Sequence, residues 1–192
     1  AREWVDKSTN QNIVVGNTQY PYCYISDEYP NDVPWDKDQI LIVTIDIEVE
    51  CENGFPNPQD AAEPLLSITM KNHQNKKIVV WGLHEFQNYR EDVDYRLCRD
   101  EDDLLIKFLD EWRMIYPEII TGWNTEFFDI PYICNRINNL FGEEFMHKLS
   151  PWNNVFAREV YQMGRKHQVY TIQGVSALDF YDLYRKFTYT NQ

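Results

Sequence analysis

Asp46 and Glu48 are the residues whose types and spacing point most directly to chemistry. They follow an apolar-rich run over residues 40–45, which predicts a buried β-strand. Alternate side chains of a strand lie on one face, so we expect the two carboxylates to project side by side. Neighbouring carboxylates repel each other unless a cation lies between them. The simpler alternative is a strand that ends in water, because Asp-x-Glu is a common short pattern.

Asp129 is the third candidate acid. It falls at the start of a helix predicted over residues 130–140 and follows a strand predicted at Glu118–Thr121. Adjacent parallel strands carry their functional groups at the same carboxyl edge, which favours a meeting of Asp129 with Asp46 and Glu48. Three carboxylates suit Mg²⁺ or Mn²⁺ better than zinc, because these hard cations prefer oxygen ligands. The alternative is that Asp129 is simply a helix N-cap.

The elements that must position these acids follow an α/β pattern. A helix is predicted from an Asp100 cap to Pro117, because apolar residues between them recur at helical spacing. Strands followed by strand–helix alternation predict an α/β domain with a mixed sheet. Further strands are predicted at Tyr22–Ser26, Leu65–Met70 and Ile78–Trp81.

Residues 1–39 are polar and rich in turn-forming residues, and we interpret them as the tail of a preceding N-terminal domain. Residues 40–192 then form the main domain. Near its end, apolar and β-branched residues flank a Gly-containing loop, which predicts a β-hairpin from Val155–Tyr161 and Gln168–Gln173. Its turn is expected over residues 162–166.

Composition excludes several classes of protein. The net charge of −13 over 192 residues argues against a protein that grips long duplexes through a basic face. The four cysteines form no Cys-x-x-Cys pair, which favours free thiols in a reducing compartment. The sequence has no signal-peptide or membrane-span pattern, so we expect an intracellular protein that does not contact membranes. The four histidines have no paired spacing, and no glycine-rich phosphate loop occurs.

Two segments carry a resemblance to a known family. Thr44-Ile45-Asp46-Ile47-Glu48-Val49 resembles the first exonuclease motif of family B DNA polymerases, and Asn124-Thr125-Glu126-Phe127-Phe128-Asp129 resembles the second. Both occur in the family's order. Flanking segments, among them Asn53-Gly54-Phe55-Pro56 and the stretch over residues 178–187, are similar to the replicative polymerases of T-even-like bacteriophages.

The resemblance implies a proofreading 3′-5′ exonuclease domain with a ribonuclease H-like fold, in which helices flank a mixed sheet and a β-hairpin protrudes. It implies hydrolysis of the 3′-terminal phosphodiester of single-stranded DNA by two Mg²⁺ or Mn²⁺ ions, with release of nucleoside monophosphates. The residues that the resemblance assigns fall into two groups. The metal ligands are Asp46, Glu48 and Asp129, and the DNA-binding residues are Asn124, Phe128 and Phe55. Arg165 is a further DNA-binding candidate, because it belongs to the basic cluster at the tip of the predicted hairpin.

The implied partners are the single-stranded 3′ end of primer DNA, the remainder of a polymerase chain and a sliding clamp, in the cytoplasm of the host cell. The family's third motif, Tyr-x-x-x-Asp, does not occur between Pro151 and Gln192. We therefore expect a domain truncated at its C-terminal end, with the last metal ligand beyond residue 192 and weak activity on its own. Two alternatives stay open: a binding module of the same fold whose acids are structural, and a related nuclease that acts on RNA.

Overall fold

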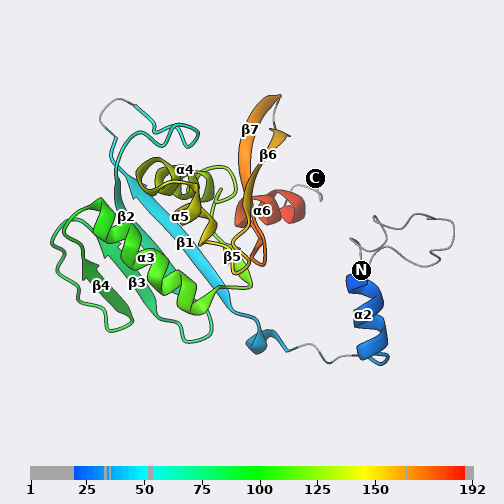
Figure 1. The fold of residues 1–192 in the computed structure, drawn as a ribbon. Coiled ribbons are helices and arrows are strands. Elements are labelled where there is room, and N and C mark those ends of the chain that lie inside the picture. The colour runs from blue at the N-terminus through cyan, green and yellow to red at the C-terminus, as the bar shows by residue number, and fades with distance from the viewer. Residues whose placement is uncertain (1–19, 33, 35, 52–53, 163, 189–192) are drawn as a thin grey trace. The chain divides into compact units, whose positions relative to one another are not determined.

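The computed structural model describes residues 20–32, 34, 36–51, 54–162 and 164–188 (Figure 1). The chain divides into two compact units, Ala1–Lys37 and Asp38–Gln192. In the first unit, helix α2 spans Tyr20–Glu28, so the strand predicted at Tyr22–Ser26 is wrong. A strand needs a partner for its backbone hydrogen bonds, whereas a helix satisfies them within the segment. A short 3-10 helix, η2 (Lys37–Gln39), follows at the junction.

The second unit is built on a six-stranded sheet, whose mixed pairing is as the sequence predicts. The strands lie in the order β4-β3-β2-β1-β5-β8, so β1 is near the centre. It pairs antiparallel with β2 on one side and parallel with β5 on the other. The strands are β1 (Ile42–Val49), β2 (Leu65–Asn72), β3 (Ile78–Gly82), β4 (Val93–Leu97), β5 (Ile119–Thr121) and β8 (Ser176–Ala177).

Helices pack against this sheet: α3 contacts β2 and β3, and α4 contacts β1. The predicted Asp100 cap is confirmed, since its carboxylate accepts a hydrogen bond from the backbone N–H of Asp103 at 2.8 Å. The helices of this unit are α3 (Glu101–Ile115), α4 (Asp129–Phe141), α5 (Glu143–His147) and α6 (Phe180–Thr188).

The two faces of β1 differ in character. Val43, Ile45 and Ile47 are buried in the core that β2, α3 and α4 share, with Ile47 paired opposite Ile68 of β2. The intervening side chains lie on the other face, where Asp46 is exposed. The alternation therefore places the first carboxylates away from the apolar core, as a strand period of two requires.

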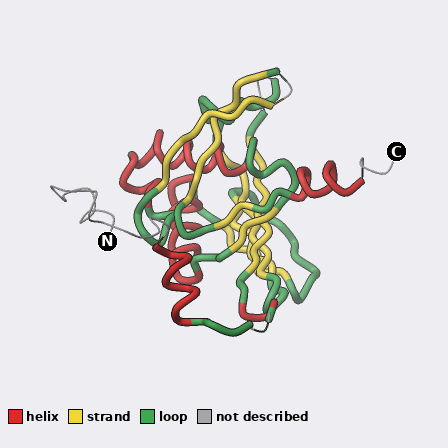
Figure 2. The backbone as a smooth tube through the Cα atoms, turned by 90° about the vertical axis from the view of Figure 1, so that its right-hand side faces the viewer, coloured by secondary structure: helices red, strands yellow, loops and turns green. Residues whose placement is uncertain are grey.

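The predicted hairpin is confirmed and extends from the body of the unit (Figures 1 and 2). It consists of β6 (Val155–Gln162) and β7 (Arg165–Ile172), paired in register up to Gln162 opposite Arg165. The turn is shorter than the 162–166 predicted, so Arg165 belongs to a strand. Gly164 adopts a φ of 73°, the left-handed conformation that a tight hairpin turn needs. Residue 163 lies outside the described residues.

Candidate active site

Strand β1 has an open backbone edge beside Asp46. The pairing of β1 with β5 ends at Thr44 opposite Thr121, because β5 is only three residues long. Glu48 lies two residues beyond Asp46 on the same face and is also exposed. The part of β1 that carries both acids therefore runs on past its parallel neighbour, and another element can approach it there.

Asp129 fills this position beside β1. Its Oδ1 accepts a hydrogen bond from the backbone N–H of Ile47 at 3.2 Å, between Asp46 and Glu48 along the strand. The N-cap position of α4 belongs to Phe128, whose side chain makes no capping hydrogen bond. The interpretation of Asp129 as a simple N-cap is therefore wrong. Its carboxylate joins the start of α4 to the open edge of β1.

The two aspartates are in electrostatic conflict. Asp129 is 5% exposed, and burial together with the nearby charge of Asp46 raises its pKa to about 7. Partial burial also raises the pKa of Asp46, because it removes water from around the carboxylate. A divalent cation between such groups would reverse this effect, because it favours the ionised form of both carboxylates.

The turn between β5 and α4 is tightly packed against β1. A Cβ atom added to Gly122 would lie 2.7 Å from the backbone oxygen of Ile45 and 2.1 Å from Oγ1 of Thr125. Only glycine allows the backbone to pass there. Asn124 then adopts a φ of 61°, a left-handed conformation that asparagine tolerates better than most residues. The chain reverses direction at this point, which places Phe128 and Asp129 beside β1.

Asp179 stabilises this turn. Its carboxylate accepts hydrogen bonds from the backbone N–H groups of Asn124 at 3.0 Å and of Glu126 at 2.9 Å. It also accepts from the N–H of Tyr181 at 2.8 Å, at the start of α6. Asp179 therefore holds the backbone of the second motif and joins it to the start of α6.

Six of the seven predicted site residues line one open cleft of about 1100 Å³, and Glu48 is not among its lining residues. The six are Asp46, Asp129, Asn124, Phe128, Phe55 and Arg165. Sequence reasoning missed several other residues of this lining. These are Ile47, residues 56–59, Trp123, Phe127 and Tyr181, and Lys166 and His167 of the basic hairpin tip line the cleft too. Aromatic residues were too numerous, at 15% of the chain, for composition to single them out.

Aromatic rings line the sides of the cleft. Phe55 is 84% exposed and its ring centroid lies 5.2 Å from that of Phe128. Trp123 packs edge-on against Tyr181 at 5.4 Å. Flat exposed rings of this kind provide stacking surfaces for unpaired bases.

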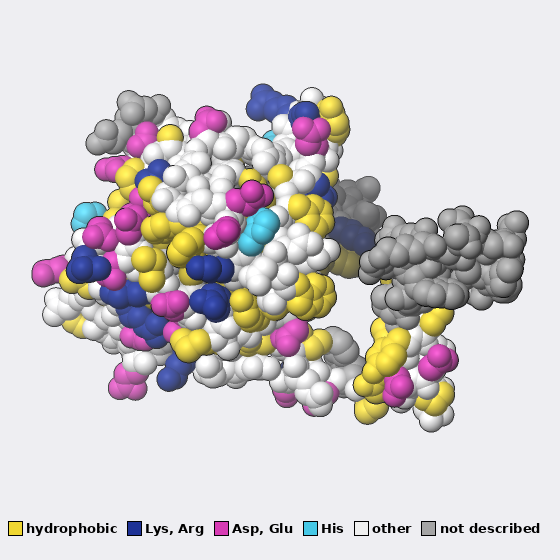
Figure 3. All heavy atoms as spheres, viewed as in Figure 1, with side chains coloured by type: hydrophobic (Ala, Val, Ile, Leu, Met, Phe, Trp, Pro, Cys, Tyr) yellow, Lys and Arg dark blue, Asp and Glu magenta, His cyan; other side chains and the backbone are white. Residues whose placement is uncertain are grey.

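The hairpin contributes the basic rim, and Figure 3 shows Lys and Arg side chains at its tip. Arg165 and Lys166 both line the cleft. The ammonium group of Lys166 contacts Glu159 across the hairpin at 2.5 Å. About halfway along the hairpin, Arg158 pairs with Glu126 of the β5–α4 turn at 2.6 Å, which ties the hairpin to the second motif. The hairpin tip therefore forms a positively charged rim of the cleft. Asp46 and Asp129 form its acidic floor.

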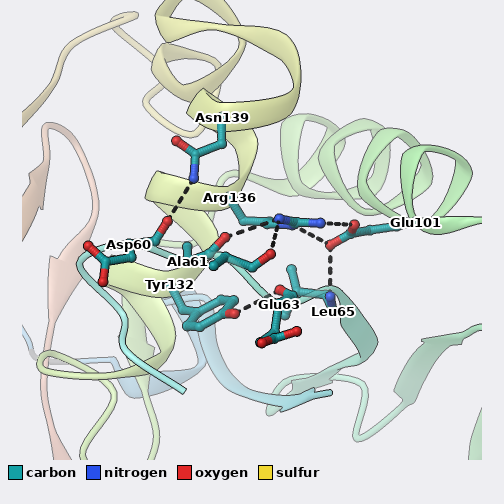
Figure 4. Close-up of polar contacts among 9 residues, drawn as sticks. Asp60, Ala61, Glu63, Leu65, Glu101, Tyr132, Arg136 and Asn139 are labelled. Carbon is teal, nitrogen blue, oxygen red and sulfur yellow. Dashed lines mark hydrogen bonds and ion pairs between the residues drawn. The ribbon is translucent and has the colours of Figure 1, made fainter. Parts of the chain in front are cut away.

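Helix α4 also fixes the segment that follows Phe55 (Figure 4). Tyr132, Asn135, Arg136 and Asn139 recur at helical spacing on one face, and each donates hydrogen bonds to backbone carbonyl oxygens within residues 58–63. Arg136 in addition forms a nearly buried ion pair of 2.6 Å with Glu101 of α3. The helix that begins with Asp129 therefore holds the Phe55 segment as well.

The donor chemistry of Asp46 and Asp129 suits Mg²⁺ or Mn²⁺, because both are carboxylates whose mutual repulsion a cation relieves. Across the described residues, no three His, Cys, Asp or Glu side chains lie close enough together to hold a metal ion. The three-carboxylate cluster that includes Glu48 therefore stays a prediction. No helix in the described part of the chain is both long and apolar enough to cross a membrane.

Comparison with known proteins agrees with this geometry. Residues 4–192 match the model of the DNA polymerase family B exonuclease domain. The chain belongs to this family. A DNA-directed DNA polymerase of Escherichia phage RB69 is 30% identical over 100% of the chain, and that of Enterobacteria phage T4 is also 30% identical over 100%. A DNA polymerase catalytic subunit of Alcelaphine herpesvirus 1 is 28% identical over 85% of the chain.

The chain spans 24% of the length of each phage polymerase and 17% of the herpesvirus subunit. The matching family describes an exonuclease domain, which agrees with the mixed sheet, flanking helices and hairpin of the ribonuclease H-like fold. The family resemblance drawn from the two motifs is therefore confirmed.

Proposed function

We propose that the chain is the proofreading 3′-5′ exonuclease domain of a DNA polymerase and removes nucleotides from the single-stranded 3′ end of primer DNA. The observation that carries the proposal is the approach of Asp129 to β1 beside Asp46, at the floor of a cleft with aromatic walls. Membership of the exonuclease-domain family supports it. The relatives are named DNA-directed DNA polymerases, so polymerisation by the whole protein belongs to the same proposal.

The chain's own residues would bind and orient the strand. Phe55 and Phe128 stack on the terminal bases, which unpaired DNA presents and a duplex does not. Arg165 at the rim contacts the phosphate backbone, because a guanidinium group pairs well with phosphate oxygens. Asn124, held in its turn by Asp179, places its side chain at the terminal nucleotide. These contacts bring the last phosphodiester over Asp46 and Asp129.

Asp46 and Asp129, with Glu48 as the expected third ligand, would hold the metal. Bound Mg²⁺ or Mn²⁺ ions would supply a water nucleophile at neutral pH and stabilise the charge of the leaving 3′ oxygen. The acidic residues would position these ions, and hydrolysis of the last phosphodiester would release a nucleoside monophosphate and leave a new 3′ hydroxyl on the strand. Because the ions reverse the local charge, an acidic domain can still bind a phosphodiester.

The decisive experiment replaces Asp46 with alanine in the full-length protein. Loss of a metal ligand should lower the rate of 3′ degradation about 10³-fold, which corresponds to about 4 kcal/mol of transition-state stabilisation. Release of labelled nucleoside monophosphate from a single-stranded DNA measures the rate. Asp110→Ala is the matched control, because Asp110 is an exposed carboxylate of α3 away from the cleft. Normal degradation by the Asp46→Ala protein would contradict the proposal.

The same assay separates the two alternatives. A binding module would bind a partner without any metal-dependent degradation of DNA, and a nuclease for RNA would degrade a matched RNA strand faster than DNA. Faster degradation of RNA would move the proposal to the second alternative. The sliding clamp and the host cytoplasm stay predictions from the family resemblance.

A further inference from the structure

Asn135 is a buried amide that connects two walls of the cleft. One wall is the Phe55 segment, residues 55–63, and the other is β7 of the hairpin, residues 165–172. It is 8% exposed and lies on α4, six residues after Asp129. Its Nδ2 donates a hydrogen bond to the backbone oxygen of Pro58 at 2.8 Å, and its Oδ1 accepts one from the hydroxyl of Tyr170 at 2.5 Å. Pro58 lies in the segment after Phe55, whereas Tyr170 belongs to β7 of the hairpin.

A second set of hydrogen bonds connects the same two segments, so that the two connections form a closed hydrogen-bond network. Nε2 of Gln168 donates to the hydroxyl oxygen of Tyr170 at 3.2 Å. Nε2 of Gln59 in turn donates to the backbone oxygen of Gln168 at 3.4 Å. The Phe55 segment and β7 are therefore joined twice, once through Asn135 and once directly. Gln59 also lines the cleft, so this hydrogen-bond network lies at the edge of the cleft.

The chemistry of this position requires an amide. A side-chain amide donates and accepts hydrogen bonds at the same time, whereas an ionised carboxylate only accepts and an alkyl group does neither. Loss of Asn135 would leave the oxygen of Pro58 and the hydroxyl of Tyr170 without this partner in a largely buried setting, which is unfavourable. The two walls would then separate more easily.

We propose that Asn135 is a positioning residue that sets the distance between the Phe55 segment and the hairpin, and thereby holds the DNA 3′ end over Asp46 and Asp129. The inference rests on the proposed function. Asn135 and Asp129 belong to the same helix. Asn135 therefore fixes the position of both walls relative to Asp129 at the floor of the cleft. Its loss should weaken binding of the strand without altering the groups at the floor.

The test uses Asn135→Ala and Tyr170→Phe in the full-length protein, with Asn138→Ala as the matched control. Asn138 is an exposed amide on the same helix and does not line the cleft. We expect Asn135→Ala to raise the KM for single-stranded DNA about tenfold, equivalent to about 1.4 kcal/mol, with kcat unchanged. Tyr170→Phe, which removes one hydroxyl and keeps the ring, should raise KM less. Asn138→Ala should leave KM at the wild-type value.

Hydrogen exchange provides a readout that does not depend on activity. Asn135→Ala should speed amide exchange in both residues 55–63 and residues 165–172, because it releases both walls. Tyr170→Phe should speed exchange only in residues 165–172. A fall in kcat at constant KM, or the same exchange pattern in Asn138→Ala, would overturn the inference.

The design separates this inference from the proposed function. If the wild-type protein degrades no DNA strand, the proposed function fails. The exchange pattern then decides alone: faster exchange in both walls of Asn135→Ala supports the bridge, and unchanged exchange in either wall overturns it.

Discussion

The floor and the walls of the cleft are built differently. Asp46 lies on the central strand β1, paired opposite Thr69 of β2, and Asp129 is buried at the first residue of α4. By contrast, Phe55 is 84% exposed on a loop, and Arg165 is at the tip of a two-stranded hairpin. The repelling charges are therefore held by elements whose backbones cannot easily relax, while Phe55 and Arg165, two of the groups that would meet DNA, lie on elements that can adapt.

Helix α4 connects these two kinds of structure. Its first residue, Asp129, belongs to the floor, and its following turns hold the carbonyl groups of residues 58–63. A single rigid element thus aligns the adaptable walls with the fixed floor.

The largest effect concerns the floor. The pKa of Asp129 is raised to about 7, so the folded metal-free protein binds this proton more tightly than the unfolded chain, where the value is 3.8. Its stability should therefore fall as the pH rises from about 4 to about 7, by on the order of 3 kcal/mol. Asp129→Asn keeps a hydrogen-bond acceptor for Ile47 and removes the charge, so it should be more stable than the wild type at pH 8.

Urea unfolding in the presence of a chelator, at pH 5 to 8, measures this difference. The gap between Asp129→Asn and the wild type should widen with pH and narrow when Mn²⁺ is added, because the cation stabilises the charged carboxylate. A gap that does not change with pH would show that the floor is not in electrostatic conflict.

The second prediction tests the rigidity of the floor. Gly122→Ala should destabilise the protein by about 2 kcal/mol, because its Cβ would overlap the backbone of β1 and Thr125. It should also slow DNA degradation by displacing the turn before Asp129. Gly142→Ala is the comparison: it has open space around its Cβ but a φ of 87°, so it should cost stability without slowing degradation. Equal loss of activity in both variants would refute a special role for the turn.

The third prediction concerns the aromatic wall. Phe55→Ala should weaken binding of single-stranded DNA about tenfold, since stacking of one base contributes about 1–3 kcal/mol. Phe86→Ala is a suitable control, because Phe86 is 63% exposed and does not line the cleft. Fluorescence anisotropy with a labelled oligonucleotide in Ca²⁺ measures both affinities. Unchanged affinity in Phe55→Ala would mean that its ring only covers Phe128.

The smallest effect is expected at the rim. Arg165→Ala should reduce the slope of log affinity against log salt by about 0.7, the value of one phosphate contact with a single strand. Arg113→Ala, at an exposed position of α3, should leave the slope unchanged. Identical slopes for all three proteins would remove Arg165 from the DNA-binding surface.

The sequence predicted the elements whose patterns are local. The apolar alternation of β1 and the helical spacing of α3 and α4 are each set within a few residues. The hairpin was also predicted, although its turn is tighter than expected. Asp46 and Asp129 could be paired because strand order brings their carboxyl edges together.

Features that depend on a distant partner were missed. Strand β8 has two residues and exists only through its pairing with β5, and β4 alternates charged with apolar residues at the sheet edge. The bond from Ile47 to Asp129 depends on the early end of β5, which no local pattern reveals. The bridge through Asn135 joins Pro58, 77 residues before it in the chain, to Tyr170, 35 residues after it.

The length of the hairpin has a mechanical consequence. Its two strands have eight residues each, and buried residues such as Val155 and Ile172 anchor them at the base. Arg158, Gln168 and Tyr170 also hold the strands about halfway along, so the free arm is the outer half of the hairpin, about 13 Å long at about 3.3 Å per residue. A rotation of about 10° at these contacts would therefore move the tip by about 2 Å, which is enough to break a hydrogen bond. The outer half of the hairpin is thus a lever, and small changes at these contacts become larger changes in the opening above the aspartates.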